Sequence, residues 1–246
     1  MIKSALKLFS LVFGNQTGDG TTFHPLKTCP ECGSKLMRTA VRAELHESQT
    51  ESHTPAKDGD LYNSSLRNEN TEWLCPNPDC PAQVRRGLVH WCSPEVMDIA
   101  GGDAVLVAKL VGKGLACDVA ELYGIQVSEL AALEGMDKDS AQKFFAAITV
   151  STKRDVWRLL FGLGIPLVGT AKAQALGKGF PTVDAVFAAG VPRLMKDGGV
   201  NEAVAQSIVR WHSDSVNRKL LKRLEKLGVN LKSESYCAAP AKIPGA

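Results

Sequence analysis

The sequence of 246 residues is poor in aromatic residues, which make up 6% of it, and it lacks any long uninterrupted apolar run. Because no stretch of about 18 apolar residues occurs, we expect no membrane-spanning helix. With so few aromatic residues, the core must consist mainly of Leu, Val and Ala, which favours helices. Glycine and proline together form about a seventh of the chain, too few for a low-complexity sequence. The net charge of +3 does not by itself indicate a nucleic-acid-binding protein.

Seven cysteines are present, and this odd number argues against a disulfide framework. Four of them form two close pairs, Cys29-x2-Cys32 and Cys75-x4-Cys80. Gly33 permits the sharp turn that the first pair needs, and two prolines restrict the second loop. Two such loops supply four thiolates, a closed tetrahedral set typical of structural zinc. The sequence therefore predicts a structural zinc site at these four cysteines in a cytoplasmic protein, where thiols stay reduced.

The residues around the two cysteine pairs predict a zinc ribbon with an enlarged tip, over residues 28–84. The short stretches 35–38 and 71–74 could pair as a hairpin whose base holds the metal. Between them, residues 43–70 form a polar insertion that is typical of a long loop. Over 39–72 there are three basic and seven acidic residues, so this part carries a charge of −4 and the rest of the chain +7. His90 and Cys92 are alternative ligands, but ordinary packing is the favoured interpretation of both.

The remainder of the chain divides into a helical domain and two terminal segments. Residues 85–232 have apolar residues at helical spacing, with short glycine-containing turns and no strand-like alternation. Residues 1–27 are an N-terminal segment and linker, and 233–246 are predicted to be a flexible tail. The first 14 residues resemble a signal peptide, but Lys7 interrupts their apolar run and no A-x-A site follows. We therefore favour a short amphipathic helix there.

Four turns in the helical domain share one pattern: an apolar helix, a short glycine turn, then small residues that open a new helix. Turns one to four occupy residues 99–103, 133–137, 163–169 and 198–201. Such a turn leaves backbone N–H groups at a helix N-terminus, an anion site that needs no charged side chain. Repeated turns of this kind can follow a DNA backbone without reading its sequence. Plain helix–helix connections are the alternative interpretation.

Three groups of motifs resemble one known family. They are Cys29-Pro-x-Cys-Gly-Ser with Cys75-x-Asn77-x-x-Cys80-Pro81-Ala82-Gln83; Leu88-x-His90-x-x-Ser93-x-x-x-Met97-Asp98-Ile99; and Leu133-Glu134-Gly135 with Ser140-Ala141-Gln142 and Leu163-Gly164-Ile165-x-x-Val168-Gly169. In order and spacing they are similar to the C-terminal half of bacterial NAD-dependent DNA ligase, and the similarity spans residues 28–231. The resemblance implies a four-cysteine zinc finger followed by a four-fold helix-hairpin-helix domain. In that family both help to grip nicked duplex DNA.

The resemblance does not extend to the catalytic parts of that family. The family's adenylation domain binds NAD and carries the catalytic lysine in a K-x-D-G motif, and the sequence contains no counterpart of it, of the OB-fold or of the BRCT domain. The string Lys57-Asp58-Gly59 lacks the spacer residue of that motif and lies in the polar insertion. We therefore expect this chain alone to bind no NAD and to join no strands, because it supplies no nucleophilic lysine or magnesium carboxylates.

The turns also depart from the family at one position. Where the resemblance predicts a second glycine, the chain has Asp103, Asp137 and Asn201, and only Gly169 is kept. Asp and Asn tolerate positive φ better than other non-glycine residues, so we expect the turns to survive. A carboxylate repels a neighbouring phosphate, however. The sequence therefore predicts that turns three and four hold DNA, whereas turns one and two mostly support the fold.

Side-chain charge supports DNA binding by the end of the helical domain. Residues 210–232 carry seven basic and two acidic side chains. The buried stripe of that helix is expected at Val216, Leu220, Leu224 and Leu227, which would point the basic side chains outward. The alternative is that these basic side chains only form a solvated surface. The same alternative applies to Arg85 and Arg86, which lie between the ribbon and the helices. The candidate DNA contacts are Gly101, Gly102, Gly135, Gly164, Gly169, Thr170, Lys172, Gly199, Arg85, Arg86, Arg218 and Lys222.

The sequence thus predicts a mainly α protein, with a small four-cysteine zinc ribbon before a helix-hairpin-helix domain. The predicted function is sequence-independent binding to the phosphate backbone of duplex DNA, with nicked duplex as a candidate preferred form, in DNA repair and replication. One alternative is the DNA-clamp subunit of a split NAD-dependent DNA ligase, which would work with a separate adenylation-domain protein. Another is a protein-interaction module that has lost DNA binding. No membrane partner is expected.

Overall fold

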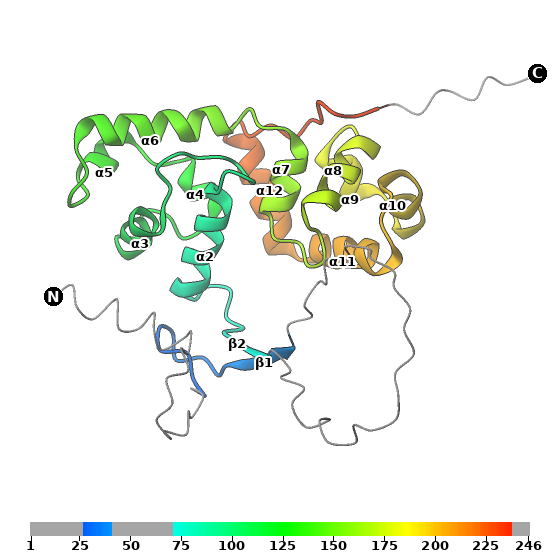
Figure 1. The fold of residues 1–246 in the computed structure, drawn as a ribbon, viewed down its shortest axis with the longest axis horizontal. Coiled ribbons are helices and arrows are strands. Elements are labelled where there is room, and N and C mark those ends of the chain that lie inside the picture. Colours follow the sequence, from blue (N-terminus) through cyan, green and yellow to red (C-terminus); the bar gives the residue numbers. More distant parts are fainter. Residues whose placement is uncertain (1–26, 41–70, 238–246) are drawn as a thin grey trace, which may run out of the picture. The chain divides into compact units, whose positions relative to one another are not determined.

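The computed structural model describes residues 27–40 and 71–237, and residues 1–26, the whole polar insertion and residues 238–246 lie outside them. Two strands precede eleven helices in this part of the chain. The helices are α2 (Pro81–Cys92), α3 (Ala104–Gly112), α4 (Val119–Leu122), α5 (Val127–Ala131), α6 (Lys138–Ser151), α7 (Val156–Gly162), α8 (Thr170–Gly179), α9 (Val183–Ala188), α10 (Val191–Gly198), α11 (Glu202–Ser213) and α12 (Ser215–Lys226) (Figure 1). This composition confirms the predicted fold class.

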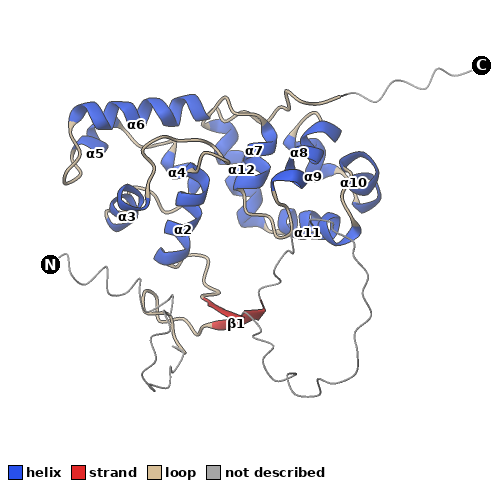
Figure 2. Ribbon diagram, in the orientation of Figure 1, coloured by secondary structure: helices blue, strands red, loops and turns tan. Residues whose placement is uncertain are grey.

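The two strands, β1 (Met37–Ala40) and β2 (Thr71–Leu74), form an antiparallel pair (Figure 2). Met37 lies opposite Leu74, and Ala40 lies opposite Thr71. The hairpin that the sequence predicted therefore exists, with its first strand two residues further along the chain than expected. The chain divides into two compact units, Met1–Leu74 and Cys75–Ala246.

The four predicted turns join consecutive helices in the second unit. Turn one joins α2 to α3, turn two joins α5 to α6, turn three joins α7 to α8, and turn four joins α10 to α11. The two helices of each pair pack against each other. Eight helices therefore form four helical hairpins, with α4 and α9 between hairpins and α12 after the last of them.

The hairpins share one core, in which aliphatic side chains predominate as the composition suggested. Trp91 is fully buried and satisfies its indole N–H by donating to the Tyr123 hydroxyl at 3.0 Å. The Ser151 hydroxyl donates to the same oxygen at 3.1 Å. Burial raises the pKa of Tyr123 to about 12. No helix in the described ranges is long and apolar enough to cross a membrane.

Two arginines near α7 hold the loop that leads into turn one. The Arg158 guanidinium donates to the carbonyl oxygens of Pro94 and Val96 at 2.8 and 2.7 Å. Arg154 forms an ion pair with Asp98, whose φ is +53°. Each contact joins positions more than 50 residues apart in sequence, so turn one is positioned by the fold and not by its own sequence alone.

The structure corrects the predicted buried stripe of α12. Leu221 and Leu224 are buried, whereas Val216 is 68% exposed and Leu227 is 38% exposed. Because two leucines stand side by side at 220 and 221, the apolar pattern fits two helix faces that differ by about 100°. Packing against the core selects the face with Leu221.

The structure also corrects the start of the predicted tail at residues 233–246. The Ser233 hydroxyl donates to Gly177 O at 2.7 Å, and the Ser235 hydroxyl donates to Asp155 Oδ2 at 3.0 Å. Upstream, Asn230 N donates to Thr152 O at 2.7 Å. Serine hydroxyls thus hold residues 233 to 237 on the helical domain through polar groups of α7 and α8.

Candidate metal centre and nucleic-acid interface

The first cysteine pair lies on a tight turn that its backbone hydrogen bonds close. Cys29 N donates to Ser34 O at 2.7 Å, and Gly33 N donates to Cys29 O at 2.8 Å. Gly33 has a φ of +71°, in the left-handed region that costs glycine nothing. The predicted need for glycine at this turn is confirmed. The Cys32 thiol also lies 3.3 Å from the Ser34 hydroxyl.

The second pair lies on the loop that leads into α2. Asn77 organises this loop, because its side-chain oxygen accepts from Asp79 N at 3.1 Å and its carbonyl accepts from Cys80 N at 3.2 Å. The Gln83 side chain donates to Cys75 O at 3.2 Å. Cys80 directly precedes α2 as its N-cap residue.

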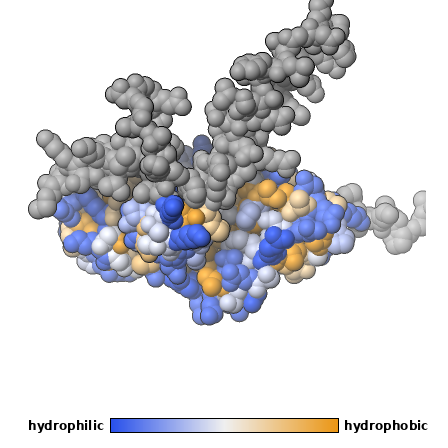
Figure 3. All heavy atoms as spheres, turned by 90° about the horizontal axis from the view of Figure 1, so that it is seen from below, coloured by the Kyte–Doolittle hydropathy of each residue, from blue (hydrophilic) through white to orange (hydrophobic). Residues whose placement is uncertain are grey.

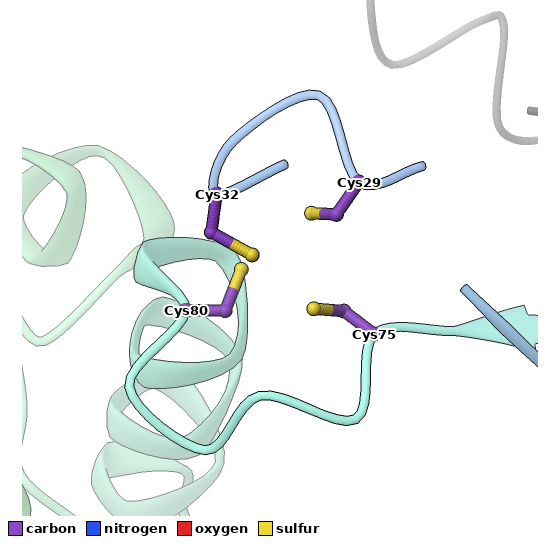
Figure 4. Close-up of side chains that lie close together, drawn as sticks. All are labelled: Cys29, Cys32, Cys75 and Cys80. Atoms are coloured by element: carbon purple, nitrogen blue, oxygen red, sulfur yellow. The ribbon is translucent and has the colours of Figure 1, made fainter. Parts of the chain in front are cut away.

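The four predicted ligands, Cys29, Cys32, Cys75 and Cys80, come together with their sulfur atoms pointing toward one another (Figure 4). All four sulfur atoms lie within 4.8 Å of one another. Four thiolates at about 2.3 Å from one ion form a tetrahedron with edges of about 3.8 Å. A small contraction would therefore let the cluster hold a metal ion. The donor set is sulfur only, and with four thiolates bound no ligand position remains open.

The two alternative ligands lie elsewhere in α2. Cys92 is buried, and burial raises the pKa of its thiol to about 12, which disfavours the thiolate that a metal needs. The His90 ring meets Phe161 edge to face, with 5.0 Å between ring centroids. Both side chains pack in the helical domain, as the favoured interpretation held.

Each of the four turns contains a glycine with a left-handed backbone. Positive φ values of +88°, +75°, +63° and +61° occur at Gly101, Gly135, Gly164 and Gly199. All four glycines are exposed. An L-residue with a side chain rarely adopts this conformation, so the backbone itself requires glycine at these four positions.

The residue at the position of the family's second glycine caps the following helix. The expectation that this position has a positive φ is therefore wrong. Asp103, Asp137, Asn201 and Gly169 are the N-cap residues of α3, α6, α11 and α8, with φ values of −77°, −85°, −77° and −85°. No positive φ is needed there. The turns therefore survive the loss of glycine because the position favours capping side chains, and not because Asp and Asn tolerate a left-handed backbone.

The caps occupy the donors that would otherwise point out of the helix. The Asp103 carboxylate accepts from Leu106 N at 2.8 Å, and the Asp137 carboxylate accepts from Ser140 N at 2.6 Å. In turn four, the Asn201 side-chain oxygen accepts from Val204 N at 3.0 Å. The bond from Ser140 lowers the pKa of Asp137, so this carboxylate stays charged at neutral pH. Turns one and two thus present a negative charge at the N-terminus of their second helix.

Turn three is built differently. Gly169 supplies no side chain to cap α8, and apart from its neighbours along the chain no described atom lies within 4 Å of the place a Cβ would take. Instead, two side chains donate hydrogen bonds to carbonyl groups of the turn. The Ser207 hydroxyl donates to Pro166 O at 2.6 Å, and the Lys172 ammonium donates to Leu167 O at 3.1 Å. The N-terminus of α8, with Thr170 as its first residue, therefore stays open.

The other predicted DNA contacts divide between surface and structural positions. Gly102 packs on Cys92, because a Cβ on this glycine would lie 2.6 Å from the Cys92 sulfur. The Arg218 guanidinium donates to His212 O at 2.9 Å and also to Ser213 O, where it closes the C-terminus of α11. Lys222 is exposed on α12. Arg85 and Arg86 lie in α2, half-buried and exposed respectively.

Two polar contacts at the turns escaped the sequence-based prediction. The Lys109 ammonium donates to Glu134 O at 2.6 Å and lies beside Gly135 in turn two. Ser207 reaches turn three from α11. Each joins residues at least 25 positions apart, and no local spacing or periodicity carries a signal of such pairs.

Comparison with known proteins gives one family model and several relatives. Residues 158–221, which contain turns three and four, match the helix-hairpin-helix motif. A DNA ligase of Synechococcus sp. is 35% identical over 201 residues, which cover 82% of this chain and 26% of that protein. A DNA ligase of Chlorobium chlorochromatii is 38% identical over 202 residues (80% and 30%), and one of Rubrobacter xylanophilus is 35% identical over 213 residues (87% and 27%). The chain thus spans between a quarter and a third of the length of these relatives.

Proposed function

The chain is homologous to DNA ligases over about four fifths of its length, and we propose that it binds duplex DNA by the phosphate backbone without reading base sequence. The observation that carries this proposal is the uncapped N-terminus of α8, which lies inside the matched helix-hairpin-helix motif. Nicked duplex is the proposed preferred form, and DNA repair and replication are the proposed setting. Reduced thiols at the metal cluster fit a cytoplasmic protein.

The N-terminus of α8 has the properties of a phosphate site. The first N–H groups of an α-helix have no acceptor within the helix, and the helix dipole places partial positive charge beside them. Gly169 allows a phosphate to approach the backbone closely, because the space around its missing Cβ is open. Lys172 adds a full positive charge in the same turn of the helix.

Turns three and four are proposed to face DNA, and turns one and two to support the fold. In turn four the backbone donor Val204 N is also occupied by the cap, but the Asn201 amide carries no charge that repels phosphate. In turns one and two the carboxylates of Asp103 and Asp137 combine an occupied donor with a repulsive charge. The exposed Lys222 on α12 is a candidate for a further phosphate contact.

Zinc is the ion that we propose for the four-thiol cluster. Four thiolates around one ion form a closed tetrahedral set, and zinc takes this set readily because its filled d shell imposes no geometry. Cys29, Cys32, Cys75 and Cys80 would hold the ion and balance its charge. With no open position, zinc here would tie the two cysteine loops together and would activate no water.

One other function fits part of the molecule. The three capped turns favour a protein-interaction module, since a capped helix N-terminus has fewer donors for DNA. This candidate excludes DNA binding, whereas a DNA-clamp subunit that works with a separate adenylation-domain protein would still require it.

Fluorescence anisotropy with nicked and intact duplexes of mixed sequence, over a salt series and on protein of measured zinc content, tests the proposed function. We expect affinity to fall with salt, with a slope of log K against log salt near −0.9 for each phosphate contacted. Changing the base sequence should leave the affinity unaltered, and nicked duplex should bind more tightly than intact duplex. Absence of binding at low salt would contradict DNA binding and favour the protein-interaction module.

A further inference from the structure

Turn three carries an exposed leucine at its tip. Leu167 is 55% exposed, although its neighbours Ile165 and Val168 are 3% and 5% exposed. Its φ is +68°, in a region that a bulky side chain rarely adopts because of steric strain. Among the described non-glycine residues, only Asp98 shares a positive φ. The turn therefore holds a large apolar side chain toward solvent in a strained backbone conformation.

The contacts around this leucine fix its position. Its carbonyl oxygen accepts from the Lys172 ammonium at 3.1 Å, and the preceding carbonyl of Pro166 accepts from the Ser207 hydroxyl at 2.6 Å. On the other side, Val168 N donates to Ile165 O at 3.0 Å. Burial of the two neighbours anchors the turn in the core, so the backbone from which the Leu167 side chain projects is held in place.

Most of the large exposed hydrophobic residues in the described ranges lie on helices. On the face drawn in Figure 3, hydrophobic and hydrophilic surface are interspersed. Leu167 differs because of its place, two residues before the open N-terminus of α8. A phosphate bound at that N-terminus brings its own deoxyribose and the adjoining groove against the tip of the turn. The carbon atoms of deoxyribose are the apolar surface of DNA next to a phosphate, and proteins that bind the minor groove place apolar side chains such as leucine against the duplex.

We infer that Leu167 is the apolar DNA contact of turn three and packs against deoxyribose in the groove beside the phosphate at α8. This inference rests on the proposed function. It gives the third hairpin two separable contributions to affinity. The contribution of the positive charge at Lys172 and the helix N-terminus to affinity falls as salt rises. The contribution of Leu167 depends on the apolar area that it buries and not on salt.

The test is anisotropy across a salt series with the Leu167→Asn variant, using the same mixed-sequence duplexes. Asparagine tolerates the left-handed backbone, so the turn is kept while the apolar surface is lost. We expect binding about fivefold weaker at every salt concentration, from the buried area lost, with an unchanged salt slope. Leu167→Met, which keeps the apolar surface, should bind within about twofold of the wild type. Thermal melting of each variant checks that it is folded.

Val105→Asn is the matched control, because Val105 is 65% exposed on α3 after turn one and should leave affinity unchanged. The inference is wrong if Leu167→Asn binds like the wild type, or if it changes the salt slope as loss of a phosphate contact would. An equal loss in Leu167→Asn and in Val105→Asn would also contradict it. Failure of the wild-type protein to bind either duplex would instead contradict the proposed function. Should Leu167→Asn not fold, Leu167→Gly tests the same expectation.

Discussion

Turn two and turn three have the same connection of two helices but treat the N-terminus of the second helix in opposite ways. In turn two, Asp137 caps α6 through Ser140 N and leaves a negative charge at the tip. In turn three, Gly169 leaves α8 uncapped, and the turn is stabilised from behind, through carbonyl groups held by Lys172 and Ser207. A turn can thus be stabilised by its donors or by its acceptors, and only the second way keeps the donors available to an anion.

Gly169→Asp would give turn three the cap of turn two, and we expect the largest effect from it. The new carboxylate would accept from Lys172 N in place of a phosphate and would repel DNA, weakening binding by about tenfold or more. The free energy of unfolding should rise by a few tenths of a kcal/mol, because aspartate caps slightly better than glycine. Anisotropy and urea unfolding measure the two opposite changes. Gly169→Ala, without charge or cap, is the matched control for the added Cβ.

A loss of affinity in Gly169→Ala equal to that in Gly169→Asp would mean that close approach to the backbone matters and the open donors do not. Unchanged affinity in both variants would remove turn three from the DNA interface. Either result would mean that the difference in capping between turns two and three does not determine DNA binding.

Uncapping turns one and two with Asp103→Gly and Asp137→Gly tests the other side of the comparison, with a smaller effect. Removing both carboxylates frees two donors and removes two repulsive charges, so we expect DNA binding to tighten by about threefold. Unfolding free energy should fall by a few tenths of a kcal/mol for each lost cap. Unchanged affinity would contradict the proposed division between supporting and DNA-facing turns. Asp103→Asn with Asp137→Asn keeps the caps and separates charge from donor availability.

The smallest expected effect is the pH dependence of the Asp137 cap. Its pKa lies below the usual carboxyl value because Ser140 N donates to it. A carboxyl group with a lowered pKa in the folded state adds stability above its unfolded pKa, and this is lost as pH falls through the folded pKa. The stability of wild type relative to Asp137→Asn should therefore decline on acidification. Urea unfolding of both proteins from about pH 7 to about pH 3 measures it. A pH-independent difference would show that the charge of the cap contributes nothing.

Local spacing predicted several features correctly. The two cysteine pairs, the glycine after the first pair and the four turns are all encoded within a few residues. Turn chemistry and metal geometry act over that distance, so a short string of sequence suffices. The hairpin of β1 and β2 was placed to within two residues for the same reason.

Features that depend on packing were missed or misplaced. Leu220 and Leu221 fit the apolar pattern of α12 equally well, and only contact with the core chose between them. The hydrogen bond from Arg218 to the His212 carbonyl in α11 was not expected, and Arg218 stays a candidate DNA contact. Arg223 forms an ion pair with Asp118, which is 105 positions away. An arginine in a sequence carries no sign of whether a carbonyl, a carboxylate or a phosphate will be its partner.

The segment after α12 bears on the order in which the helical domain completes its fold. The Asn230 side chain donates to Arg154 O across 76 positions, and Ser235 reaches Asp155 across 80. Such distant pairs raise the contact order, since a long loop must close before either bond forms. During synthesis, α7 and α8 emerge from the ribosome well before residues 230 to 235. The final hydrogen bonds of the α6–α7 junction therefore wait for the last part of the domain to be translated.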